Sequence, residues 1–122
     1  MTPAARSLNV FGIYLLGLGA VLLVAPNVLL QAFGMPSTGE IWIRVVGMLV
    51  AFLGLYYRTA AAAEFVPMFS LSVLIRFSVL LFFVLFVAAG WAQWPLVLFG
   101  LVDAAGAAWT WTALRQGRPE EP

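Results

Sequence analysis

Cysteine and histidine are both absent from this chain. Without cysteine there is no disulfide, no iron–sulfur cluster and no thiol nucleophile. Without histidine there is no ordinary haem ligation, no histidine-based zinc or di-iron site and no imidazole proton shuttle. These two absences exclude most redox and hydrolytic membrane enzymes, and we expect neither a cofactor nor a metal site.

Charge is scarce as well. Of the 122 residues, 9% are charged and 64% are hydrophobic, whereas an average soluble domain is about 25% charged. A water-soluble fold needs charged side chains to cover its surface, so most of this surface must face lipid. The net charge of +1 indicates no acidic partner, and the chain has no basic patch that would bind nucleic acid.

Long apolar stretches make up most of the chain. A bilayer core requires about 20 mostly apolar residues in helical form, because every backbone polar group must be satisfied within the segment. We expect a single domain over residues 1–116, followed by a polar, disordered tail over 117–122. Four segments of the domain predict transmembrane helices, at about 8–30, 41–57, 67–89 and 95–114.

The connections between these segments are short, which forces sequential helices to pack antiparallel. The sequence therefore predicts an all-α membrane protein, a four-helix up-down bundle. The two loops on one side of the membrane contain no basic residue, and the positive-inside rule places the opposite side, with both termini, in the cytoplasm. The arginines at the ends and in the loop on that cytoplasmic side are Arg6, Arg58, Arg115 and Arg118.

Three ionisable side chains lie inside the predicted spans: Arg44, Arg76 and Asp103. An arginine at mid-bilayer costs about 2.5–3.5 kcal/mol even on a lenient insertion scale, so such residues face the bundle and find partners. Counting along the helices places Asp103 between the two arginines in depth. Ser72 lies one turn before Arg76, where it can accept a hydrogen bond from the guanidinium.

Helical spacing groups these side chains with other residues. Arg44 shares a face with Gly47 and Gly54, and Asp103 shares a face with Thr110. Small residues mark places where helices approach closely, so we expect Arg44 to point into the bundle. The candidate binding residues are therefore Arg44, Arg76, Asp103, Glu40, Ser72 and Thr110.

Two interpretations of this cluster stay open. Two arginines against one aspartate leave a buried positive charge that a phosphate, a carboxylate or a quinone-type carbonyl could satisfy, which predicts an anion or lipid-headgroup site. In the second interpretation the charges neutralise each other and only fix the helix register. Glu40 then pairs with Arg44, four residues later, and Asp103 pairs with Arg76.

Catalytic patterns are missing. No serine is accompanied by a histidine, no two carboxylates share a depth, and no metal-ligand spacing occurs, so we predict a protein that is not an enzyme. Small four-helix multidrug exporters require an acidic residue in the first helix, and this first segment has none. The one-sided arginines also differ from the weak charge bias of proteins that assemble as antiparallel pairs.

A series of short motifs runs through most of the chain: Ala25-Pro26, Gly34-Met35-Pro36, Trp42-Ile43-Arg44-Val45-Val46-Gly47, Gly54-Leu55-Tyr56-Tyr57 and Leu101-Val102-Asp103-Ala104-Ala105-Gly106. Together they resemble a group of small, uncharacterised four-helix bacterial membrane proteins that are distantly similar to the DoxX-like families. The resemblance implies a four-helix bundle in a bacterial inner membrane, and it implies no reaction. DoxX-type proteins are loosely linked to redox or stress-response complexes, and the lack of cysteine weakens that link here.

Two functional hypotheses follow. The first is a non-enzymatic interaction or accessory subunit of the inner membrane that holds a lipid or quinone-like molecule near the Arg/Asp cluster. Its partners would be membrane lipids, a second copy of the chain or a larger membrane complex, and not nucleic acid. The alternative is a small transporter or channel for an anion or amphipathic solute, with the path formed by Arg44, Asp103 and Arg76.

Overall fold

A computed structural model describes residues 1–116 of the chain, and these residues form helices and connecting turns without any β-strand. Four of the helices are long and apolar enough to span a membrane. The predicted all-α, multi-pass membrane fold is therefore confirmed, while the predicted disordered tail over 117–122 lies outside the described residues. The helices are α1 (Pro3–Val24), α2 (Pro26–Ala32), α3 (Trp42–Ala62), α4 (Val66–Ala88) and α5 (Leu96–Gln116).

The first predicted helix, over 8–30, is instead two helices. Proline has no backbone N–H and its ring clashes with the carbonyl one turn earlier, so Pro26 ends α1 and begins the short helix α2. The start also differs, because Thr2 caps α1: its hydroxyl accepts a hydrogen bond of 3.2 Å from the backbone N–H of Ala5. An N-cap followed by proline is a strong helix start, and it extends α1 beyond the purely apolar run.

The other helices lie close to their predicted ranges. α4 and α5 differ from the predicted 67–89 and 95–114 by one or two residues at each end. α3 continues to Ala62, past the predicted end at 57, because the run of small residues that follows Tyr57 and Arg58 stays helical and packs against α1.

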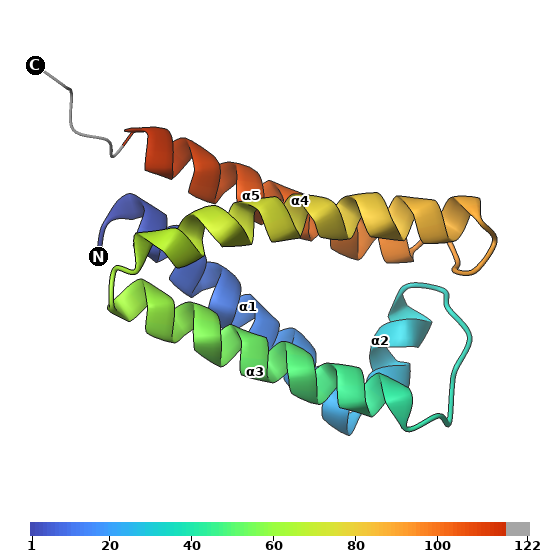
Figure 1. Ribbon diagram of the computed structural model, residues 1–122. Coiled ribbons are helices and arrows are strands. Elements are labelled where there is room, and N and C mark those ends of the chain that lie inside the picture. Colours follow the sequence, from blue (N-terminus) through green and yellow to red (C-terminus); the bar gives the residue numbers. More distant parts are fainter. Residues whose placement is uncertain (117–122) are drawn as a thin grey trace, which may run out of the picture.

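The long helices form two antiparallel pairs (Figure 1). α1 packs along α3, α4 packs along α5, and α1 also contacts α5. The pairs lie close together at the end where α1 begins and α5 ends, which we call the narrow end. They diverge toward the opposite end, the wide end, where α2 and the loop over 33–41 lie between them.

Glycines allow the close contact between α1 and α3. A Cβ atom placed on Gly19 would lie 2.5 Å from the backbone nitrogen of Ala51 and 2.6 Å from the carbonyl oxygen of Gly47. A Cβ on Gly54 would likewise lie 2.7 Å from the carbonyl oxygen of Gly12. Small residues at helix contacts are a main source of packing in membranes, where the hydrophobic effect does not drive helices together.

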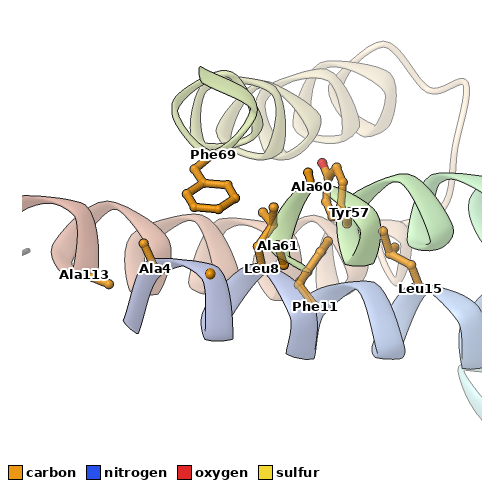
Figure 2. Close-up of a cluster of buried hydrophobic side chains, with 10 residues drawn as sticks. Ala4, Leu8, Phe11, Leu15, Tyr57, Ala60, Ala61, Phe69 and Ala113 are labelled. Carbon is orange, nitrogen blue, oxygen red and sulfur yellow. The ribbon is translucent and has the colours of Figure 1, made fainter. Parts of the chain in front are cut away.

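The apolar core lies toward the narrow end and draws on all four long helices (Figure 2). Leu8 and Phe11 of α1 are buried beside Tyr57 of α3 and below Phe69 of α4. Small residues complete the cluster, among them Ala4, Ala60, Ala61 and Ala113.

A polar contact closes this end. Glu64, in the turn between α3 and α4, accepts hydrogen bonds from the backbone N–H of Thr2 at 2.8 Å and from its hydroxyl at 2.7 Å. Both hydrogen bonds lower the pKa of Glu64 below its ordinary value, and the bond from the Thr2 backbone N–H has the larger effect. The start of α1 is thereby joined to the α3–α4 turn.

The glycine contact makes a testable prediction. We expect Gly19→Ala to destabilise the protein by about 1–3 kcal/mol, because the added methyl group overlaps the backbone of α3. Gly17→Ala is the matched control, since a Cβ at Gly17 meets nothing within 4 Å. Alanine also favours a helix over glycine by about 1 kcal/mol, so the control should be neutral or stabilising. Thermal unfolding in one detergent compares the variants, and equal stabilities would contradict the contact.

Candidate functional site

Arg76 lies near the middle of α4 and is only 2% exposed. Its Nε donates to the backbone oxygen of Ser72 at 3.2 Å, and its Nη2 donates to the Ser72 hydroxyl at 3.1 Å. Nη2 also donates to the hydroxyl of Thr110 in α5 at 2.8 Å. The Thr110 hydroxyl in turn shares a hydrogen bond of 2.7 Å with the Ser7 hydroxyl of α1. The hydrogen bond to Ser72 expected from the sequence spacing is present, and the network joins three helices.

Two aromatic rings lie against the same guanidinium. Its Cζ is 4.7 Å from the ring centroid of Phe11 in α1 and 5.8 Å from that of Tyr57 in α3. A cation over an aromatic face is attracted by the ring quadrupole, and the attraction grows when both groups are desolvated. Arg76 therefore has partners on every one of the four long helices.

One nitrogen of Arg76 has no hydrogen-bond partner. Among the side-chain nitrogens and oxygens buried within residues 1–116, Nη1 alone is unsatisfied. It lies beside α5, where a Cβ on Gly106 would be 3.1 Å away. A buried donor without an acceptor costs about 1–3 kcal/mol, and more when it is charged, so the bundle keeps an unused hydrogen-bond donor at its centre.

Asp103 is half-buried on α5, about one turn before Gly106. Within residues 1–116 no hydrogen bond or ion pair connects its carboxylate to Arg76, whose bonded N–H groups go to Ser72 and Thr110. The predicted direct pairing of Asp103 with Arg76 is therefore not formed. The guanidinium is held by the carbonyl and hydroxyl of Ser72 and by the hydroxyl of Thr110. The Asp103 carboxylate interacts with it only through longer-range electrostatic attraction.

Arg44 lies away from this cluster. Its side chain is exposed, and Nη1 donates to the carbonyl oxygens of Leu23 and Val24, the latter at 3.0 Å. The last carbonyls of a helix have no partner inside it, and a cation is favourable there. The expectation that Arg44 points into the bundle is therefore wrong. Arg44 and Gly47 do share the side of α3 that faces α1, but α1 ends at the level of Arg44. The guanidinium therefore binds the carbonyls at the end of α1.

Glu40 does not pair with Arg44. Because α3 begins at Trp42, Glu40 precedes the helix and the spacing of four residues does not place the two side chains together. Its backbone N–H donates to the Thr38 hydroxyl at 3.2 Å. Of the six candidate residues, Arg76, Ser72 and Thr110 are in direct contact within residues 1–116. Glu40 and Arg44 lie apart from them, at the wide end.

Between the two helix pairs lies a cavity of about 390 Å³, which we call the wedge cavity. Along α3 its wall runs from Ile43 to Tyr57, roughly 21 Å at about 1.5 Å per residue. Four of its lining residues carry polar groups: Tyr14, Tyr57, Arg76 and Asp103. The apolar lining comes from all five helices and the loop after α2: Phe11, Leu15, Leu18, Leu22, Leu29, Leu30, Met35, Ile43, Val46, Val50, Leu53, Ile75, Val79, Phe83, Leu96 and Phe99.

A larger hollow of about 670 Å³ lies at the narrow end, between the starts of α1 and α4 and the last turns of α5. Its polar lining residues, Thr2, Glu64, Ser70 and Arg115, are all exposed. The wedge cavity differs because its wall is almost entirely apolar and includes the buried Arg76, and ligand sites are typically apolar hollows with a few placed polar groups. The wedge cavity is therefore the candidate site.

Several residues of the wedge cavity and of the Arg76 network were not singled out from the sequence. Ser7 lay outside the predicted first span, although the Thr2-Pro3 cap signal would have included it in the helix. Phe11 and Tyr57 look like ordinary core and interface aromatics, and no spacing rule pairs them with an arginine on another helix. Tyr14 also lines the cavity, and nothing in the sequence marks it as a site residue.

The arginine network makes a second prediction. Thr110→Val keeps the side-chain shape but removes the acceptor of Arg76 and the partner of Ser7, so we expect a loss of stability of about 1–3 kcal/mol. Thr112→Val on the same helix is the control, because within residues 1–116 its exposed hydroxyl bonds only to the Trp109 carbonyl. Thermal unfolding of both variants in one detergent measures the difference. A Thr110→Val protein as stable as its control would mean that the network does not hold Arg76.

Comparisons with protein-family models, with curated proteins and with solved structures found no match to this chain. The resemblance to DoxX-like proteins stays a prediction from the short motifs.

Proposed function

We propose that this protein is a non-enzymatic membrane subunit that holds a lipid-soluble, amphipathic molecule in the wedge cavity. The observation that carries the proposal is a hollow of about 390 Å³ within the membrane-spanning helices, with an apolar wall and an unsatisfied Arg76 nitrogen in the residues that line it. Small-molecule sites of this kind measure about 300–1,000 Å³. A lipid or quinone-like molecule has the matching division into an apolar body and one polar group.

The shape of the cavity supports an elongated occupant. Its wall follows α3 for roughly 21 Å and ends near Tyr57, while α2 and Met35 line it toward the wide end. The loop after α2 is held by two hydrogen bonds between Asn27 and the backbone of Thr38, at 2.8 and 3.1 Å. A fixed loop at the wide end preserves the space between the helix pairs.

The membrane assignment belongs to the same proposal. The one-sided arginines support an inner membrane with both termini in the cytoplasm, which puts the narrow end on the cytoplasmic side. The motif resemblance supports a bacterial source. Large apolar side chains are exposed along every long helix, which suits contact with lipid, a second copy or a larger membrane complex.

Transport along a column of charges is less well supported. That alternative requires Arg44, Asp103 and Arg76 to line one path, whereas Arg44 is engaged with the carbonyls that end α1. Arg44 is also not among the residues that line the wedge cavity. The accessory, ligand-holding role is therefore the better-supported function.

Filling the cavity tests the proposal. Val46 is 49% exposed and lines the wedge cavity, so Val46→Trp should occupy its space. Val84 is 44% exposed on α4 and lines none of the hollows described above, so Val84→Trp is the matched control. We expect the wild type and Val84→Trp to co-purify with an amphiphile that Val46→Trp loses by about tenfold or more, which corresponds to about 1.4 kcal/mol.

The measurement is mass spectrometry of molecules extracted from each protein after purification in one mild detergent. Thermal unfolding checks that both tryptophan variants are folded. Equal recovery of every extracted molecule from the two variants would contradict binding in the wedge cavity, and flux through liposomes abolished by Val46→Trp would favour the transporter instead.

A further inference from the structure

The chemistry of the polar group that the cavity accepts can be inferred from three features of its lining: the depth of Arg76, its free nitrogen and the place of Asp103. We propose that the wedge cavity selects an uncharged head group with a hydrogen-bond-accepting carbonyl, attached to an apolar chain, and that Asp103 excludes anions. This inference rests on the proposed function, because it names the class of molecule that the cavity holds.

Arg76 lies deep within the membrane-spanning part of the bundle. Arg76 is the eleventh of the 23 residues of α4, so it lies about 15 Å from one end of the helix and about 18 Å from the other. A phospholipid keeps its charged head at the membrane surface, and moving an ionised group to this depth carries a large desolvation cost. A carbonyl group loses far less on leaving water, so it can reach Arg76 while its chain fills the apolar part of the cavity.

Nη1 of Arg76 is a hydrogen-bond donor without a partner in residues 1–116. Ser72 and Thr110 occupy Nε and Nη2 of Arg76, and Nη1 has no acceptor. The guanidinium lies over the Phe11 ring, and both Phe11 and Arg76 line the cavity, so a head group has to pass this ring to reach Nη1. One oxygen with free lone pairs would then satisfy the donor that the protein leaves unmatched.

The carboxylate of Asp103 lies on the way to this donor. Asp103 lines the cavity and lies about one turn closer to the wide end of α5 than Gly106, the residue beside Nη1. A head group that approaches Nη1 from the wide end therefore passes the carboxylate. With one Arg76 and one Asp103 the cavity is formally neutral, which disfavours an anion and leaves room for an uncharged acceptor.

The experiment uses three probes with alkyl chains of similar length. Methyl dodecanoate has an uncharged carbonyl head, dodecanesulfonate has a permanently anionic head, and dodecane has no head. Each competes with radiolabelled methyl dodecanoate for the full-length protein in lipid nanodiscs, and empty nanodiscs give the background. We expect wild-type protein to prefer methyl dodecanoate over each of the other two by about tenfold or more.

Asp103→Asn tests the role of the carboxylate while keeping the shape of the side chain. Removal of its negative charge should raise the affinity for dodecanesulfonate by about tenfold and leave the affinity for methyl dodecanoate nearly unchanged. Glu64→Gln is the control, because it removes a carboxylate that lies outside the wedge cavity, and it should keep the wild-type selectivity.

The outcomes separate the two proposals. No saturable binding of any probe to the wild type would overturn the proposed function together with this inference. Saturable binding with equal affinities for methyl dodecanoate and dodecane would keep the cavity as a binding site and overturn recognition of the head. A wild-type preference for dodecanesulfonate, or an unchanged selectivity in folded Asp103→Asn, would overturn the exclusion of anions by Asp103.

Discussion

A guanidinium in the middle of a membrane domain must be paired, and at Arg76 the partners come from every long helix. Ser72 of α4 and Thr110 of α5 accept its hydrogen bonds, while its central carbon lies over aromatic rings from α1 and α3. In lipid these helices gain little from burying apolar surface against one another, so polar and close-packed contacts decide where they meet. Through these contacts Arg76 touches both helix pairs, and the hydrogen bond between Thr110 and Ser7 of α1 joins the pairs a second time.

The cavity exists because the two helix pairs are packed together on one side of Arg76 and separated on the other. Toward the narrow end, Leu8 and Phe69 fill the space between the pairs with apolar side chains. Toward the wide end, Pro26 ends α1, and the chain turns into α2 between the two pairs instead of continuing alongside α3. Glycines hold α1 closely against α3, and the other pair diverges from them toward the wide end, so the space between the pairs is a property of the fold and not of a single loose side chain.

Sequence reasoning predicted the helices better than the site. Apolar run length identifies all four spans, because a membrane leaves few other structures possible, and the position of Ser72 before Arg76 predicts their hydrogen bond. Arg44 shows the limit: its helical face was read correctly from Gly47, but its partner depends on where α1 ends, which Pro26 determines elsewhere in the chain. Phe11 and Tyr57 could not be assigned to Arg76 either, since contacts between helices depend on relative rotation and depth that no local spacing encodes.

The contact between Arg44 and the end of α1 has a consequence for the order of assembly. Its acceptors, the carbonyls of Leu23 and Val24, belong to a part of the chain that is synthesised before α3. Arg44 can therefore be satisfied as soon as α3 enters the membrane, and the glycine contact with α1 can close at the same time. Arg76 meets Thr110 only when the last helix is present, so the first pair can be complete before the second, and the second wall of the cavity forms with the final step of synthesis.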